Sequence, residues 1–321
     1  QRTGRAPRRH QAARDFKKSL GHFGTGISER YVLIEQLRSS SIEDYTTEEL
    51  CLALGVSRSG FYDHTRKGLR PRLQQDQILA QEIAEAFADS RQTYGTARLR
   101  HELRDRGHQC GRRRIGRLMR RQGLKALQKG RFIPRTTDSS HGRKPAPLLL
   151  PDMPPLTRPM QAWVTDITYI PTREGWLFLA AEIDLFSRRV VGWAAGDTME
   201  TALVIEALDH AVAQASGRLT GLVHHSDQGS QYASHHFTAA LANLGISQSM
   251  SRRGNCYDNA TAESFWATLK TECFNNIIPE TRAAARSMIF DYIETFYNPL
   301  RRHSSLGFLS PEKFENQFLN N

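Results

Sequence analysis

The chain has 321 residues, enough for two or three domains, and no apolar run approaches the length of a membrane helix. Its net charge of +11 is unevenly placed. Residues 1–150 hold 31 Lys and Arg against 15 Asp and Glu (31 − 15 = +16), and residues 151–321 hold 13 against 18 (13 − 18 = −5). This asymmetry indicates a part that grips nucleic acid, followed by a part that gathers metal ions.

The cysteines do not form a metal site. None of them makes a Cys-x-x-Cys pair, and no pair of histidines is spaced to complete a zinc site with them. We interpret all four as reduced thiols of a cytoplasmic protein. They are Cys51, Cys110, Cys256 and Cys273.

A helix-turn-helix outline lies near the start of the chain. Glu29–Leu37 has apolar residues at helical spacing. Thr46 or Thr47 can cap a second helix, Gly55 can supply a tight turn, and Ser57 can cap a third helix. This order predicts a helix-turn-helix domain.

A second helical pair is expected after it. Gln74–Asp89 is amphipathic, a further helix is expected from Tyr94 to about Arg106, and an arginine-rich helix follows over 112–121. Six arginines in ten residues with no acid favour contacts to DNA phosphates over a merely solvated face. The predicted DNA-contacting arginines are Arg58, Arg98, Arg112, Arg113, Arg114, Arg117, Arg120 and Arg121.

Residues 131–160 are expected to form a linker. Six prolines between positions 145 and 159 exclude a regular element there. We therefore expect few contacts between the front and rear halves, and expect fragments that end near Arg131 or begin near Pro159 to fold separately.

The rear half predicts an α/β fold. Three strands in a meander, followed by alternating helices and strands, are typical of a ribonuclease H-like core, with a mixed five-stranded sheet and flanking helices. A further helix is expected from Thr281 to about Tyr297. The predicted core strands cover 163–170, 176–184, 188–195, 221–226 and 247–251, and the predicted core helices cover 201–215, 234–244 and 260–273.

Three acidic residues stand out in this core. Asp166 lies inside the first strand, Asp227 follows the fourth strand, and Glu263 lies in the first turn of the last core helix. Sixty residues separate the first two (227 − 166 − 1) and 35 separate the second and third (263 − 227 − 1). Such carboxylates can converge on two divalent cations, which activate an attacking oxygen and stabilise the leaving oxygen at a phosphodiester. Carboxylate ligands favour Mg²⁺, for which Mn²⁺ can substitute.

Each acid also has a simpler interpretation. Asp166 is alternatively an edge-strand aspartate, although an unpaired acid buried in this strand would be costly. Asp227 is alternatively a loop cap, and Glu263 a first-turn acid favoured by the helix dipole. Lys270 shares a helix face with Glu263, so a contact to DNA near the scissile phosphate and a solvated lysine are equally good interpretations.

Other polar residues of the core are better explained by structure. Asp184 is expected in a turn or paired with Arg188, and Asp258 is expected to cap the helix that carries Glu263. His224 and His225 are expected to be core or hydrogen-bonded histidines rather than site residues.

Three stretches resemble motifs of insertion-sequence transposases. His225–Tyr232 resembles their second-aspartate motif, Gly254–Trp266 their glutamate motif, and Arg302–Gly307 their C-terminal signature. These are the marks of the IS-three family within the DDE integrase-core superfamily. The resemblance covers roughly Glu29 to Phe314 and corresponds to the second reading frame (OrfB-type), or to that part of an OrfAB fusion.

The resemblance implies a transposase that binds the inverted repeats at the ends of its element. It implies cleavage of an end to give a 3′-OH, attack on the other end to form a circle, and integration of that circle into target DNA. Asp166, Asp227 and Glu263 would be both the catalytic residues and the ligands of two Mg²⁺ ions. The implied partners are double-stranded DNA and further copies in a homodimer or higher synaptic assembly, at the nucleoid of a bacterial cytoplasm.

Two other functions fit the same residues. A metal-dependent nuclease on this fold would cleave with water and join nothing, and a catalytically silent regulator would bind the element's ends only. The long basic front half argues against the nuclease, and the presence of all three acids argues against the regulator. The expected division is a basic arm (1–28), a helix-turn-helix domain (29–72), a second helical DNA-binding domain (73–130), a linker (131–160), the catalytic core (161–275) and a C-terminal helical segment (276–321).

Overall fold

The computed structural model describes residues 26–39, 45–67, 71–127, 145–215, 219–252 and 259–319. The chain divides into two compact units, Gln1–Glu82 and Ile83–Asn321, with the boundary inside helix α5 (Pro71–Asp89). No helix in the described ranges is both long and apolar enough to cross a membrane.

The first unit contains the helix-turn-helix order that the sequence predicts. Thr46 caps the second helix, because its hydroxyl accepts a hydrogen bond from the Glu49 backbone N–H while the Glu49 side chain accepts one from the Thr46 backbone. Gly55 adopts a φ of 65° at the turn, and the Ser57 hydroxyl accepts from the Gly60 backbone N–H at 3.1 Å. The helices are α2 (Ile27–Ser39), α3 (Thr47–Ala53) and α4 (Arg58–Lys67), and their shared core holds Tyr31, Ile34, Leu50, Cys51 and Phe61.

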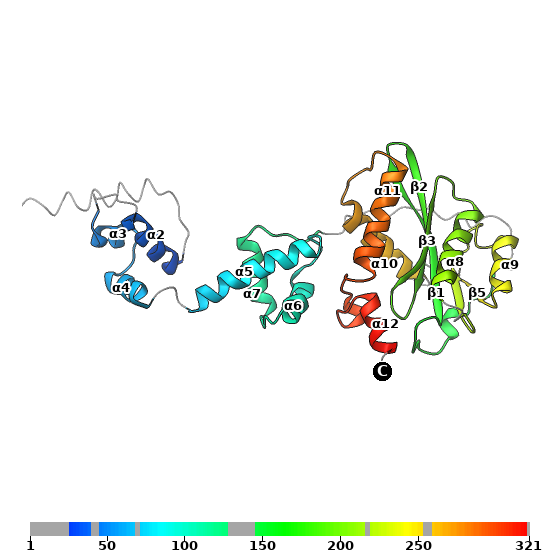
Figure 1. Cartoon of the computed structure of the whole chain (residues 1–321), viewed down its shortest axis with the longest axis horizontal. Coiled ribbons are helices and arrows are strands. Elements are labelled where there is room, and N and C mark those ends of the chain that lie inside the picture. The colour runs from blue at the N-terminus through cyan, green and yellow to red at the C-terminus, as the bar shows by residue number, and fades with distance from the viewer. Residues whose placement is uncertain are drawn as a thin grey trace, which may run out of the picture. The chain divides into compact units, whose positions relative to one another are not determined.

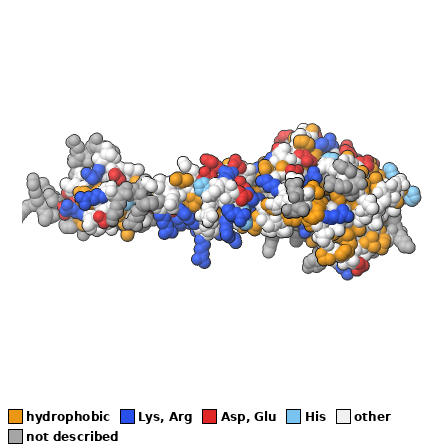
Figure 2. Space-filling view, turned by 60° about the horizontal axis from the view of Figure 1, so that its bottom comes forward, with side chains coloured by type: hydrophobic (Ala, Val, Ile, Leu, Met, Phe, Trp, Pro, Cys, Tyr) orange, Lys and Arg blue, Asp and Glu red, His pale blue; other side chains and the backbone are white. Residues whose placement is uncertain are grey.

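The second helical pair has the predicted amphipathic pattern. Helix α6 (Thr96–Asp105) packs against α7 (Arg112–Arg121). Leu99 and Leu103 of α6 are buried, and so is Ile115 of α7. Figure 2 shows Lys and Arg side chains gathered on one side of the part of the chain that holds α5 to α7, with acidic side chains on the opposite side.

The rear part has the predicted mixed five-stranded sheet. The strand order is β3-β2-β1-β4-β5. β2 pairs antiparallel with both β1 and β3, while β4 pairs parallel with both β1 and β5. This arrangement confirms the ribonuclease H-like fold and places Asp166 on the central strand. The strands are β1 (Ala162–Thr172), β2 (Gly175–Asp184), β3 (Val190–Gly196), β4 (Val223–Ser226) and β5 (Ser247–Met250).

Helices cover both faces of the sheet (Figure 1). α8 (Thr201–Ala215) and α9 (His235–Asn243) lie on one side, and α10 (Ala260–Leu269) and α11 (Arg282–Phe290) on the other. Gly192 of β3 allows a close approach of α8, because a Cβ there would lie 2.5 Å from a helix carbonyl oxygen. The core on this side includes Trp163, Val191, Val204, Leu208, Tyr232 and Phe237.

The C-terminal third differs from the sequence prediction in detail. The helix expected over 260–273 is α-helical only as far as Leu269, the end of α10. A π-helical segment, η3 (Lys270–Phe274), continues it. The helix expected over 281–297 likewise changes from α11 into a π-helical segment η4 (Asp291–Tyr297). A final helix that the sequence interpretation did not locate is α12 (Pro311–Leu319), and 3-10 turns occur at η1 (Leu150–Asp152) and η5 (Ser304–Leu306).

The expectation of few contacts between the front and rear halves was wrong. Helix α6 and the segment before it belong to the same compact unit as the sheet. The reason is electrostatic: Arg302, near the end of the chain, donates hydrogen bonds to Glu102 and Asp105 of α6. The prolines do exclude regular structure over 145–149, but contacts distant in sequence join the two halves.

The C-terminal signature contains a histidine that is held neutral. Arg301 Nη1 lies 3.2 Å from Nε2 of His303, and burial, reinforced by Arg301, lowers the pKa of His303 to about 2. The unfolded chain binds a proton at this histidine below a pH of about 6.5, and the folded chain does not. Folding stability should therefore fall as the pH drops from about 6.5 towards 2.

Because of this histidine, we expect the free energy of unfolding to fall by about 1.4 kcal/mol for each unit by which the pH drops below about 6.5. Urea unfolding at pH 7.5 and 5.5 should show the loss, and His303→Gln should reduce it. If both proteins have the same pH slope, His303 is not the group that titrates.

Candidate active site

Asp166 is held at the centre of the sheet by two hydrogen bonds. Its Oδ1 accepts from the Ile167 backbone N–H at 2.8 Å, and its Oδ2 accepts from the Trp266 indole N–H at 3.0 Å. Burial raises the pKa of Asp166 to about 7, with a further contribution from the nearby Asp227. The carboxyl group is therefore fixed in direction and close to a second negative charge.

The strand register explains why Asp227 lies beside Asp166. β1 and β4 are adjacent and parallel, and Val164 pairs with His225. Asp166 and Asp227 each follow that pair by two residues, so the two carboxylates lie near each other, where β4 ends beside the middle of β1. The Gly229 backbone N–H donates to Asp227 Oδ1 at 2.9 Å, which fixes the turn after β4.

Helix α10 places the third acid near these two aspartates. Glu263 lies in its first turn and is exposed. Trp266 lies three residues further along, on the same side of the helix, and donates to Asp166. Glu263 also raises the pKa of Asp166, as the smallest of the named influences. The helix start is fixed by Asn259, whose amide lies 3.4 Å from the Thr165 carbonyl oxygen and donates to it.

The donor set fits a hard divalent cation. Two nearby carboxylates, one with a pKa raised by burial and by its neighbour, would be relieved of repulsion by a bound cation. Within the described ranges, however, no three His, Cys, Asp or Glu side chains gather closely enough to hold a metal ion together.

Lys270 lies close to the same centre. Its ammonium group is 4.9 Å from the centroid of the Tyr169 ring, a cation–π distance. Burial lowers the pKa of Lys270, and the charge of Asp166 acts in the opposite direction. This placement argues against a freely solvated lysine, and a contact of Lys270 with DNA stays a prediction.

The rival polar residues have structural roles. Asp184 accepts from the backbone N–H groups of Met160 and Ser187 at 2.8 Å each, as expected for a turn residue. His224 Nε2 lies 2.9 Å from the buried Glu182 carboxylate, and His225 Nδ1 lies 2.9 Å from the Ser249 hydroxyl. Asp258 lies outside the described residues.

The predicted DNA-contacting arginines fall into three places. Arg58 lies on α4 in the first unit and pairs with Glu48 at 3.3 Å. Arg98 lies on α6 but is directed inward, 3.7 Å from Glu272 and over the ring of Tyr94. The remaining six share α7, where Arg112, Arg113, Arg120 and Arg121 are exposed and Arg114 and Arg117 are half-buried.

Sequence reasoning missed the role of Trp266. It lies in the motif that contains Glu263, and the three-residue spacing places both residues on one helix side. That spacing was a usable signal, but the motif alone does not show that the indole faces a strand aspartate. The missed contact is the one that ties α10 to β1.

Family comparisons agree with this architecture. The family described as "Integrase core domain" matches residues 157–256, and a second family with the same description matches residues 244–311. The family described as "HTH-like domain" matches residues 74–132. The fold and these matches define a transposase or integrase of the DDE class, which is a polynucleotidyl transferase.

Curated relatives identify the family within this class. The chain is 43% identical over 269 residues to an insertion element IS600 uncharacterized 31 kDa protein of Shigella sonnei, covering 84% of this chain and 98% of that protein. It is 38% identical over 292 residues to transposase InsF for insertion sequence IS3A of Escherichia coli strain K12, covering 90% and 99%. The chain therefore belongs to the IS3 family of insertion-sequence transposases.

Two solved structures have a partly similar course of the chain. A chain of the simian T-cell lymphotropic virus intasome, in complex with a regulatory subunit of protein phosphatase 2A, matches with a TM-score of 0.42 and 18% identity, covering 73% of this chain and 74% of that chain. The catalytic core domain of HTLV-2 integrase in complex with magnesium matches with a TM-score of 0.38 and 16% identity, covering 49% and 97%.

Proposed function

We propose that this transposase binds the terminal inverted repeats of its insertion sequence and cleaves one end to leave a 3′-OH. That hydroxyl then attacks the other end to form a circle, and a second strand transfer inserts the circle into target DNA. The observation that carries the proposal is the β1–β4 register, which brings Asp166 next to Asp227, at the point where the Trp266 indole connects α10 to β1.

The proposed roles follow from position. Asp166, Asp227 and Glu263 would hold two Mg²⁺ ions, or Mn²⁺ in their place, through carboxylate oxygens. When bound, the ions supply Lewis-acid activation of the attacking and leaving oxygens. Trp266 keeps the Asp166 carboxylate in one orientation, and Lys270 provides positive charge for a DNA phosphate near the aspartates.

The proposed partners are double-stranded DNA and further copies of this chain. The helical parts over 29–72 and 73–130 would contact the element ends, with the linker over 131–160 leading to the catalytic core and its C-terminal segment. A homodimer or larger synaptic assembly would hold two ends together. With these partners, the protein would act at the nucleoid in the bacterial cytoplasm.

End-labelled DNA tests the proposed function. The full chain is incubated with duplexes that carry a terminal inverted repeat and flanking DNA, in Mg²⁺, and bound, nicked and joined products are scored. We expect a nick at the element end that leaves a 3′-OH, followed by joined strands. Nicking without joining would instead indicate a nuclease, and binding without nicking would indicate a regulator.

Neutralising the arginines at the start of α7 should weaken DNA binding. Changing Arg112, Arg113 and Arg114 together to Gln removes three phosphate contacts if all three bind DNA. The slope of log affinity against log salt should then flatten by up to about 0.9 for each lost contact. Fluorescence anisotropy at several salt concentrations measures this slope, with Lys313→Gln on α12 as the control. An unchanged slope would mean that the arginines are only solvated.

A further inference from the structure

Two adjacent arginines near the end of the chain, Arg301 and Arg302, form ion pairs with two segments that lie far apart in the sequence. Only 4% of the Arg301 side chain and 8% of the Arg302 side chain are exposed. Charged side chains are rarely buried to this extent unless they are paired. Arg301 pairs with the helix that follows the glutamate motif, and Arg302 pairs with α6 of the HTH-like region.

Arg301 is locked to the helix that carries Glu263. Its Nε and Nη2 donate to the two carboxylate oxygens of Glu272, each at 2.6 Å. The Tyr292 hydroxyl donates to the same carboxylate at 2.9 Å. Glu272 lies in η3, which continues α10 through Lys270 in helical conformation. The orientation of the active-site helix is therefore connected to Arg301.

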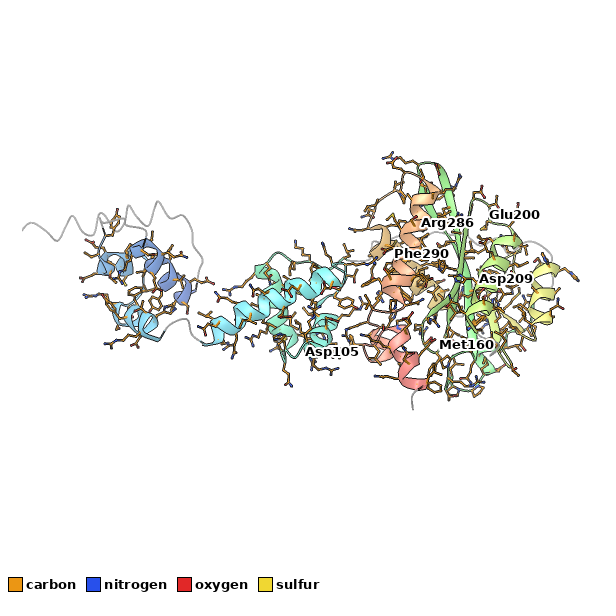
Figure 3. All side chains as sticks on the ribbon, in the orientation of Figure 1. Asp105, Met160, Glu200, Asp209, Arg286 and Phe290 are labelled. Carbon is orange, nitrogen blue, oxygen red and sulfur yellow. The ribbon has the colours of Figure 1, made fainter. Side chains whose placement is uncertain are left out.

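Arg302 is locked to α6. Its Nε donates to Glu102 at 2.9 Å, its Nη2 donates to Asp105 at 2.7 Å, and its Nη1 donates to the Phe308 carbonyl oxygen at 3.0 Å. Asp105 ends α6 on the side that faces the C-terminal segment (Figure 3). One guanidinium group thus uses its planar geometry to hold a helix end and a tail loop together.

Two aromatic contacts reinforce this attachment. The buried Tyr94 hydroxyl donates to the Leu300 carbonyl oxygen at 3.1 Å and accepts from the Arg302 backbone N–H at 2.8 Å. His101 of α6 stacks on Phe308, with ring centroids 3.9 Å apart and an interplanar angle of 12°. Apolar packing alone would tolerate sliding, whereas these hydrogen bonds have fixed direction.

The attachment has consequences for α7, because α7 packs on α6. A DNA phosphate held by the arginines of α7 would lie at a set distance from the core only if α6 is fixed to the core. The chain between them has six prolines over 145–159 and no regular element over 145–149. The contacts of Arg301 and Arg302 supply the fixed geometry that the linker does not.

We infer that Arg302, Arg301 and Tyr94 are positioning residues that clamp the α6–α7 pair onto the integrase core, so that DNA bound by α7 is presented to Asp166 in one register. This inference rests on the proposed function for its DNA-related part. We call these three residues, with Glu102, Asp105 and Glu272, the clamp.

A distance measurement in the DNA-free full chain tests the clamp without relying on activity. Spin labels are attached through a ketone-bearing amino acid at two exposed positions, Arg120 on α7 and Asp209 on α8. Asp209 is labelled in Figure 3. The protein should give one narrow distance distribution. Arg302→Gln should broaden it, and so should Tyr94→Phe, which keeps the ring but removes both hydrogen bonds.

A control separates the clamp from surface pairing between the same segments. Arg91 pairs with Asp291 at 2.6 Å, but 58% of the Asp291 side chain is exposed. Because exposed ion pairs contribute little, Asp291→Asn should leave the distance distribution narrow. A broad distribution in the unmodified protein, or a narrow one in both Arg302→Gln and Tyr94→Phe, would overturn the inference.

The functional test compares two quantities, the affinity for the element end and the rate and position of its cleavage. The Tyr94→Phe protein should bind the terminal repeat with unchanged affinity, because α7 is intact. Its rate of cleavage at the correct phosphate should fall by about tenfold or more, because the DNA is misplaced relative to Asp166. Cuts should also spread to neighbouring phosphates, an outcome that simple loss of folded protein does not produce. Unchanged rate and cut position in a variant with a broadened distance would refute the positioning role. If the unmodified protein gives the narrow distance but cuts no DNA, the clamp stands and the proposed function fails.

Discussion

Replacing any one of the three acids should abolish cleavage and joining while sparing DNA binding. Asp166→Asn, Asp227→Asn and Glu263→Gln each remove a ligand charge and leave the side-chain shape nearly unchanged. Loss of metal-ion stabilisation is worth several kcal/mol, so rates should fall by about a thousandfold or more. Strand transfer on end-labelled DNA in Mg²⁺ measures the rate, and gel shift with the same DNA measures binding.

Asp209→Asn is the matched control for these variants. Asp209 is an exposed carboxylate on α8, on the opposite side of the sheet from α10, so its loss should change neither rate nor binding (Figure 3). Normal strand transfer by Asp166→Asn, Asp227→Asn or Glu263→Gln would remove that residue from the site. Loss of activity in Asp209→Asn would show that the assay responds to surface charge in general.

Glu272→Gln should be the most destabilising single change outside the hydrophobic core. It leaves the Arg301 guanidinium buried without its counter-charge, and breaking a buried pair in this way costs about 3–5 kcal/mol. Urea unfolding of the full chain measures the loss. Replacing both partners by apolar residues of similar size, Glu272→Met with Arg301→Met, should recover most of the stability.

An exposed ion pair provides the comparison for Glu272. Glu280 accepts from Arg173 at 2.8 Å, but 75% and 69% of the two side chains are exposed. Glu280→Gln should therefore cost no more than about 1 kcal/mol. If Glu272→Gln is as mild as Glu280→Gln, the Arg301–Glu272 pair is more hydrated than its burial indicates.

Local patterns predicted the regular elements of this chain well. The three-strand meander and the helix over 201–215 agree closely with β1 to β3 and with α8, because their signals are periodicity and turn residues within a few positions. The cap at Thr46 and the turn at Gly55 were likewise visible, since each depends on its own neighbours only. The register that aligns Asp166 and Asp227 follows from a fold that the element order already indicated.

Contacts between residues far apart in the sequence were not predictable in this way. The prolines exclude a regular element over 145–149 but not the 3-10 turn at Leu150–Asp152, and they gave no sign that Arg302 reaches back to Glu102 and Asp105. An arginine that will be buried in an ion pair has the same local sequence as a solvated one. The same limit applies to Trp266, whose partner Asp166 lies 100 residues earlier.

Arg98 illustrates the related difficulty with basic patches. Charge density predicted it as a DNA contact together with the arginines of α7, but the structure places it beside Glu272. Its role in DNA binding stays a prediction, and its intramolecular contact shows why net charge alone does not separate the two roles. The six arginines of α7 keep the stronger case, because four of them are exposed on one helix.

We expect this site to transfer DNA strands rather than only to hydrolyse them. A pre-nicked element end that carries either a 3′-OH or a 3′-deoxy terminus tests it most directly, since strand transfer needs the hydroxyl as its nucleophile. With Mg²⁺ and the full chain, the 3′-OH end should be joined to a second end, and the 3′-deoxy end should not. Joined product from neither end, alongside continued cutting of intact ends by water, would contradict the claim.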